Sequence, residues 1–275
     1  MRFILLLFPF LFIACVAEPG TDAGPKPEAT SLTGKPLYPM PESAKSKAKK
    51  DSLLAVAKTN WEANPNDVDQ LIWYGRRLAY LSRYNEAIAV YTQGIEQHSQ
   101  VPELYRHRGH RYLSQRKLDK AISDFETAAE LAKDQNDRIE PDGLPNKLNI
   151  PLSTLKFNIY YHLGLAHYLK GDFAKAANVY KQCMQHSKNA DLLTATSDWL
   201  YMTYRRLGQD EAAQQLLPRI TPEMNIIEND AYYNRLLMYK GLKEAEALLD
   251  FDNITEDNLL NLVTQGYGVG NWYLY

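Results

Sequence analysis

The pattern of hydrophobic and polar positions divides the chain into three parts. Residues 1–14 are almost continuously apolar after the single charge of Arg2. Residues 15–50 contain six prolines and few apolar side chains, and such a segment cannot bury enough surface to fold. Beyond residue 50, apolar positions recur with the spacing of helices. The pattern therefore predicts a hydrophobic leader over 1–14, a disordered proline-rich tether over 15–50 and a helical body over 51–275.

The helical body repeats itself every 34 residues. When Gly75 is aligned with Gly109, a larger apolar residue, an alanine and an aromatic residue coincide as well, and a third unit starting at Gly164 keeps the same internal spacing. The coinciding positions are Gly75, Tyr84, Ala87 and Tyr91, then Gly109, Leu118, Ala121 and Phe125, then Gly164, Phe173, Ala176 and Tyr180. A period of this length indicates stacked helical hairpins.

The period and the residue types resemble the tetratricopeptide repeat family. The resemblance implies an all-α fold, in which antiparallel helix hairpins stack into a right-handed superhelical solenoid. Residues 52–63 are predicted to be a single helix that caps the N-terminal end. The clear units cover about 68–101, 102–133 and 157–190, the looser units cover 191–218 and 230–249, and an unpaired helix covers 259–275.

Small and aromatic residues explain how such hairpins pack. The glycine in the first helix of a unit (helix A) and the alanine in the second (helix B) let the two helices approach closely. The aromatic residue four positions after the alanine lies on the same face of helix B, so we expect it to fill the space between neighbouring hairpins. In the looser units, Gly208 and Gly241 mark the turns and Ala213 holds the alanine position.

One insertion interrupts the repeat. Gly109 and Gly164 are 55 positions apart, which is 21 more than one period. The surplus includes residues 134–151, with three prolines and four acidic residues. An insertion of this kind forms a loop on one face of a solenoid, and we expect it to lie near the ligand. Its acidic residues lack the spacing of a calcium-binding loop, which favours a solvated loop; they are Asp134, Asp137, Glu140 and Asp142.

The leader ends in a sequence that resembles the lipobox of bacterial lipoproteins. The resemblance lies in Leu11–Cys15, and Phe12 departs from it because leucine is commonest there. It implies that residues 1–14 are a signal peptide, that lipid is attached to Cys15, and that the protein is anchored in a bacterial cell envelope, facing the periplasm or the surface. The alternative is an ordinary secretory signal cut near Ala17, which would give a secreted protein.

Composition and motifs argue against catalysis. The formal net charge of −2 gives no attraction to nucleic acid, and the sequence holds no phosphate-binding loop, serine-nucleophile motif or zinc-protease motif. Arginines flank the His107 and His110 pair and oppose a bound cation. Cys183 occupies a small-residue position of helix B and is expected to be a buried, inert thiol. We therefore expect no enzyme activity, no cofactor and no metal site.

The family resemblance also implies where a partner binds. Helix A of each unit lines the concave side of the solenoid, and its outward positions form the groove. The predicted groove residues are Ile72, Arg76, Tyr80, Arg106, His110, Tyr161 and Tyr168, with Ala79, Leu113, Ser114, Leu165, Leu169, Asp198, Met202, Arg205 and Arg206 at equivalent positions. Arginine beside tyrosine is typical of interface hot spots. The lysine and asparagine set by which some family members clamp a peptide carboxylate is not present.

Two functions fit this layout. The first is a non-catalytic protein–protein interaction scaffold of the cell envelope, which holds a segment of a partner protein in the concave groove. The alternative is a carbohydrate-capturing surface lipoprotein, in which Trp73, Trp199 and Trp272 stack on sugar rings. Either protein would be attached to the membrane through lipid on Cys15.

Substitution of the lipobox cysteine tests the proposed anchor. Without its thiol, Cys15→Ser has no atom to which the lipid can be attached, so we expect the variant to leave the membrane fraction or to accumulate unprocessed. Fractionation and gel mobility of the two proteins measure this. Unchanged fractionation and mobility would contradict the lipoprotein interpretation.

Overall fold

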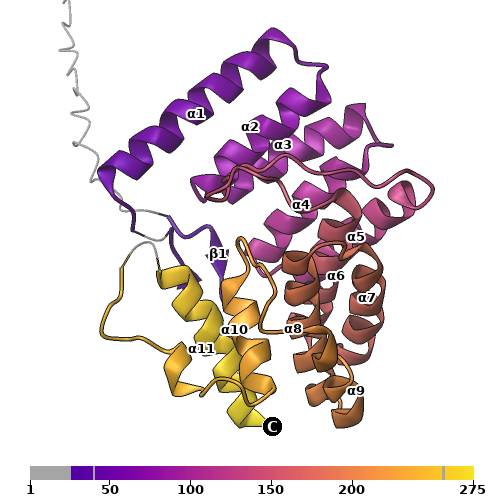
Figure 1. Cartoon of the computed structure of the whole chain (residues 1–275). Coiled ribbons are helices and arrows are strands. Elements are labelled where there is room, and N and C mark those ends of the chain that lie inside the picture. The colour runs from indigo at the N-terminus through magenta and orange to yellow at the C-terminus, as the bar shows by residue number, and fades with distance from the viewer. Residues whose placement is uncertain (1–25, 40, 256–257) are drawn as a thin grey trace, which may run out of the picture.

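A computed structural model describes residues 26–39, 41–255 and 258–275, so the leader and Cys15 lie outside the described residues. The fold class predicted from the sequence, an all-α solenoid of antiparallel helix hairpins, is confirmed (Figure 1). Among the described residues, no helix is both long and apolar enough to cross a membrane. The helices are α1 (Ala44–Ala63), α2 (Val68–Tyr80), α3 (Tyr84–Gln97), α4 (Pro102–Ser114), α5 (Leu118–Ala132), α6 (Leu155–Lys170), α7 (Phe173–His186), α8 (Ala190–Arg206), α9 (Asp210–Gln214), α10 (Asp230–Tyr239) and α11 (Leu259–Leu274).

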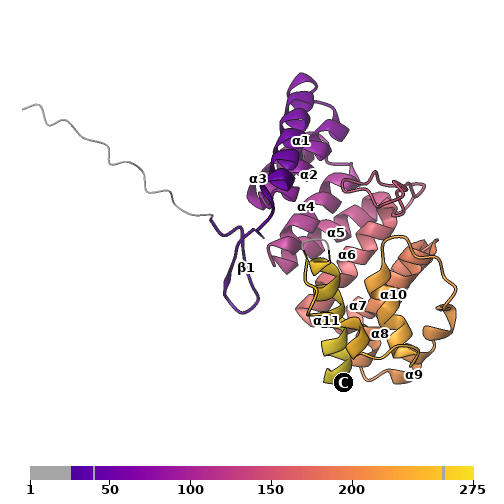
Figure 2. The same ribbon diagram turned by 60° about the vertical axis from the view of Figure 1, so that its left-hand side comes forward.

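The hairpins stack in sequence order (Figures 1 and 2). Each of α2–α3, α4–α5 and α6–α7 forms one hairpin, and each hairpin packs on the next. The first helices of successive hairpins also contact one another, α2 with α4, α4 with α6 and α6 with α8. These contacts place the four helices in one row, which is the concave face.

An aromatic ring joins each hairpin to the next. Tyr91 packs on Gly75 of its own hairpin, where a Cβ would lie 2.5 Å from the ring. Tyr91 also stacks on His107 of the next hairpin, with the ring centroids 5.7 Å apart. The same arrangement recurs with Phe125 on His162 and with Tyr180 on Trp199. The expectation that these rings fill the space between neighbouring hairpins is correct.

The last two hairpins are incomplete. After α8 the chain turns at Gly208, where φ is positive. Helix α9 then has only five residues before the chain passes into the 3-10 turn Leu217–Arg219. Pro218 has no amide hydrogen to donate to the carbonyl of Gln214, so the helix cannot continue. After α10 and the turn at Gly241, only the 3-10 turn Glu246–Leu248 stands where a second helix is expected. Helix α11 then folds back onto α8 and α10, so it is packed rather than unpaired.

Residues 26–39 and 41–50 contradict the prediction of a disordered tether over 15–50, of which residues 15–25 lie outside the described residues. Strands β1 (Ala29–Thr30) and β2 (Pro36–Leu37) form an antiparallel hairpin. The hairpin is held against the body because the Glu28 carboxylate accepts hydrogen bonds from the backbone and side chain of Asn85 at 3.0 and 2.8 Å. Helix α1 begins at Ala44, earlier than residue 52, because the Ser43 hydroxyl caps it by accepting from the amide of Ser46.

The buried alanine of helix B provides a test of this packing. Ala176 is fully buried between α6 and α7, whereas Ala174, on the same helix, is exposed. Ala176→Leu should overpack the contact and lower the free energy of unfolding by about 1–3 kcal/mol. The matched control Ala174→Leu should change it by no more than about 0.5 kcal/mol. Urea denaturation of both variants measures the difference, and equal effects would show that the helix contact is misassigned.

Candidate functional site

The concave face, formed by α2, α4, α6 and α8, is covered at both ends by other parts of the same chain. The insert 134–151 crosses the N-terminal part of this face (Figure 1). Helices α10 and α11 lie over the C-terminal part. Among the described residues, an opening remains in the middle of the predicted groove.

The insert is bound to α2 through its backbone. The guanidinium of Arg76 donates to the carbonyl of Pro141 at 2.9 Å, and that of Arg77 donates to the carbonyl of Gly143 at 3.1 Å. A side chain at Gly143 would overlap the hydroxyl of Tyr80. The absence of a Cβ at this position therefore lets the insert lie directly against α2.

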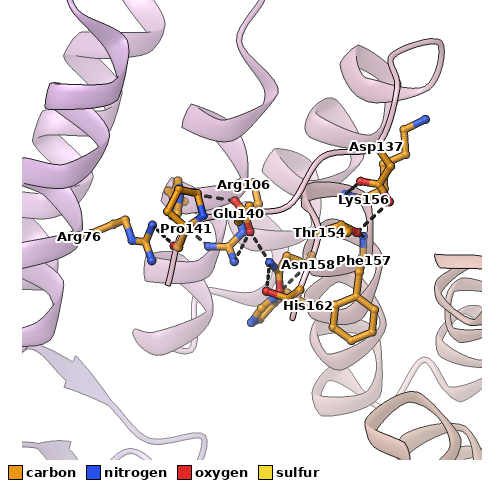
Figure 3. A network of polar contacts seen from close by, with 12 residues as sticks. Arg76, Arg106, Asp137, Glu140, Pro141, Thr154, Lys156, Phe157, Asn158 and His162 are labelled. Carbon is orange, nitrogen blue, oxygen red and sulfur yellow. Dashed lines mark hydrogen bonds and ion pairs between the residues drawn. The ribbon is translucent and has the colours of Figure 1, made fainter. Parts of the chain in front are cut away.

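Glu140 anchors the insert to α4 and α6. Its carboxylate is buried, pairs with Arg106 at 2.9 Å and accepts a hydrogen bond from the side-chain amide of Asn158 (Figure 3). Its backbone amide donates to the carbonyl of Ser153 at 3.0 Å. Four of the insert's residues were expected to be solvated acids, and for Glu140 this expectation is wrong. A carboxylate in such a place is stable only because its charge and its oxygens have partners.

The C-terminal helices are bound to the groove by tyrosines and by one buried ion pair. The hydroxyl of Tyr161 donates to that of Tyr232 on α10 at 3.0 Å, and the hydroxyl of Tyr168 donates to Asn271 on α11 at 3.2 Å. Asp198 of α8 pairs with Arg235 of α10, and both are buried almost completely.

The seven predicted groove residues thus divide into two sets. Ile72, Arg106 and Tyr168 are at most 9 % exposed, so on their own they present little surface to a partner. The repeat register places these positions on the concave face correctly but contains no information about what covers that face. The remaining four, which are half-buried, are Arg76, Tyr80, His110 and Tyr161.

An open cleft remains between the middle helices and α11. Its volume is about 400 Å³. Its lining includes the groove positions His110, Leu113, Leu165 and Leu169 together with Trp199, Tyr232, Val263 and Tyr267. Sequence reasoning missed Val263 and Tyr267, because the repeat pattern does not show that α11 returns to the concave face. The sequence signal that could have indicated them is the number of apolar and aromatic residues in 259–275, some of which are exposed on α11.

The histidines near the cleft are neutral at neutral pH. Burial lowers the pKa of His107 and His110 well below the usual value, and neighbouring arginines lower it further. Burial likewise lowers the pKa of His162 to about 3. In residues 26–39, 41–255 and 258–275, no group of three or more His, Cys, Asp or Glu side chains could hold a metal ion.

Cys183 is fully buried, as expected. Burial raises the pKa of its thiol to about 12, so the side chain is a neutral thiol at physiological pH. A nucleophilic cysteine needs the thiolate form and access for a substrate.

Comparison with protein families supports one of the predicted repeat units. Residues 157–190, which include α6 from Phe157 onward and all of α7, match the model of the tetratricopeptide repeat family. This match confirms the resemblance for that unit. No curated protein matches the chain by sequence.

Solved structures give only distant likenesses. MamA from Desulfovibrio magneticus RS-1 is 16% identical over 64% of this chain and 85% of that chain, with a TM-score of 0.48. TTC0263, a thermophilic tetratricopeptide repeat protein of Thermus thermophilus, is 16% identical over 64% and 83%, with a TM-score of 0.46. YrrB, a tetratricopeptide repeat protein with an unusual peptide-binding site, is 16% identical over 77% and 91%, also at 0.46. Because these scores lie below 0.5, the fold rests on the helices and repeat of this chain.

The Glu140 anchor can be tested by its effect on stability. Glu140→Ala leaves Arg106 buried without its carboxylate, so the free energy of unfolding should fall by about 3 kcal/mol. Asp134→Ala removes an exposed acid of the same insert and should change it by less than about 0.5 kcal/mol. Denaturant unfolding of both variants is the measurement. A loss for Glu140→Ala no larger than for the control would mean that the insert is not anchored there.

Proposed function

We propose that this protein is a non-catalytic scaffold of the cell envelope, which binds a segment of another protein in the open cleft between α4, α6, α8, α10 and α11. The observation that carries the proposal is the cleft itself. It is lined by helix A residues of successive hairpins, the half-buried Leu165 with the buried Leu113 and Trp199, and by exposed side chains of α11. Val263 is 60% exposed and Tyr267 is 42% exposed.

The lining of the cleft suits a protein segment. Contiguous exposed apolar residues rimmed by polar groups are typical of sites where proteins bind one another. Leucine and valine side chains provide area to cover, while Tyr267 and His110 provide hydrogen-bonding groups at its edge. Because both ends of the concave face are covered by the chain itself, the bound segment would be short and would not follow the whole length of the solenoid.

The envelope location rests on the sequence of the leader. The apolar run of residues 1–14 followed by Cys15 supports attachment to a membrane by lipid. The tether to the body would be shorter than 15–50, because the β1–β2 hairpin is held to the body by Glu28. The cleft would thus be presented close to the membrane, facing the periplasm or the surface.

The arrangement of the tryptophans does not favour the carbohydrate alternative. Trp73 lies beneath the guanidinium groups of Arg76 and Arg77, at 4.4 and 4.9 Å from the ring centroid. Trp199 is buried, and Trp272 stacks on Tyr239. A sugar-binding platform needs an exposed ring face, and these rings are occupied by neighbouring side chains.

Charge placed in the cleft tests the proposal. Val263→Asp replaces an exposed apolar side chain of the cleft, whose lining also includes Arg116 and Arg235, by a carboxylate. Because the apolar contact with the partner is lost, capture should fall about tenfold or more, as for a hot-spot residue. Leu260→Asp is the matched control, because Leu260 lies on the same helix, is 75% exposed and does not line the cleft. Since both residues are exposed, neither variant should change stability by more than about 0.5 kcal/mol.

The experiment uses tagged full-length protein and detergent-solubilised envelope membranes. Proteins retained by the wild type and by Leu260→Asp, but lost with Val263→Asp, are partners that bind in the cleft. The proposal is wrong if Val263→Asp retains every protein that the wild type retains while its melting temperature is unchanged.

A further inference from the structure

A second, smaller pocket lies beside the cleft, between α2, α3 and α4. Its volume is about 130 Å³. It is lined by three arginines, two tyrosines and two histidines, among them Arg76, Tyr80, Tyr91, Arg106, His110 and Arg111. A cavity holds one water molecule at roughly 10–15 Å³, so this pocket has room for a group of several heavy atoms. His110 lines both the pocket and the cleft, which places them side by side.

Positive charge in the pocket exceeds negative charge. Of the three guanidinium groups, Arg106 pairs with Glu140. Among residues that the structure describes, no carboxylate forms an ion pair with Arg76 or Arg111. Arg76 instead donates to the hydroxyl of Tyr80 and to a backbone carbonyl. The other acidic group nearby is Asp142, which is close enough to Arg76 to be influenced by its charge.

Arg111 differs from the other two arginines of the pocket in having no polar partner among the described residues. Its guanidinium has the ring of Tyr84 at 5.7 Å as a neighbour, and it makes no hydrogen bond with any described side chain or backbone group. Burial lowers the pKa of Arg111, but arginine remains charged in proteins at neutral pH. A partly buried cation without an anionic partner is costly, and an anion in the pocket would offset that cost.

The tyrosines supply neutral hydrogen-bond donors. Tyr91 is 1% exposed and lines the pocket, and its hydroxyl has no hydrogen-bond partner in the described part of the chain. Burial raises the pKa of Tyr91, so its hydroxyl keeps the proton that it can donate. The pocket therefore combines fixed positive charge with an unused donor, which is the chemistry that an oxyanion requires.

We infer that this pocket binds one oxyanion, a carboxylate or a phosphate group, between Arg76 and Arg111, with the hydroxyl of Tyr91 as a further donor. Either a free ion or an acidic side chain of a segment bound in the neighbouring cleft can supply this group. The site goes beyond the proposed function, because a free ion can fill it whether or not the cleft binds a protein.

Calorimetric titration of the full-length, detergent-solubilised protein tests the site. The probes are inorganic phosphate and acetate, each added at constant ionic strength with chloride as the balancing ion. Melting temperature is a poor measure here, because phosphate stabilises most folds by exclusion from their surface. Direct heats of binding separate a saturable site from that general effect.

We expect saturable binding of at least one probe to the wild type. Arg111→Gln should weaken it at least tenfold, because it removes the unpaired charge. Arg116→Gln is the matched control, since Arg116 is exposed, carries the same charge and does not line the pocket; it should bind as the wild type does. Tyr91→Phe removes a single hydroxyl and keeps the ring on Gly75, so it should weaken binding severalfold even if Arg111→Gln does not fold.

The outcomes are distinct. Tighter binding of phosphate assigns the pocket to a free phosphate ion, and tighter binding of acetate assigns it to a carboxylate side chain; both support the inference. Absence of saturable binding of both probes to the wild type overturns it, as does full binding by folded Arg111→Gln and Tyr91→Phe. These results are independent of the capture experiment with Val263→Asp, so the failure of one proposal is distinguishable from that of the other.

Discussion

The architecture depends on one contact, in which an aromatic ring of helix B lies between the glycine of its own hairpin and a ring of the next. Gly75 lets Tyr91 approach the backbone of α2, and the ring of Tyr91 stacks on His107 of the next hairpin. Because the contact repeats at Phe125 and Tyr180, it sets both the spacing within a hairpin and the joint between hairpins. The row of first helices, and hence the concave face, follows from this geometry.

The concave face is largely used by the chain itself. Backbone carbonyls of the insert accept hydrogen bonds from Arg76 and Arg77, and Glu140 neutralises Arg106. At the other end, Asp198 and Arg235 hold α10 against α8. Several arginines that could otherwise bind a partner in the groove are thus already bonded to groups of the same chain. What these contacts leave open is a cleft lined by apolar and polar side chains, and a small pocket in which two of the three arginines have no anionic partner among the described residues.

Local periodicity made the repeats predictable, because the glycine, alanine and aromatic positions interact within one hairpin or with the next. The tether was mispredicted since proline content says nothing about Glu28 meeting Asn85, 57 positions away. The covered groove was missed for the same reason. Tyr168 and Asn271 are 103 positions apart, and no local pattern shows that they will meet. The repeat register predicts which helices carry the groove positions, whereas the segments that pack against them are remote in sequence.

The insert changes how this solenoid can come apart. In an ordinary repeat array each unit contacts only its neighbours, so terminal units fray independently. Here Arg76 is bonded to a residue 65 positions away, and Asn146 of the insert donates to Glu228, 82 positions away. Separation of α2 from the body therefore also breaks its contacts with the insert 134–151, which is bound to α4 and α6 as well. We therefore expect α2, α4 and α6 to open together, so that the length of the insert limits how far these helices can move apart.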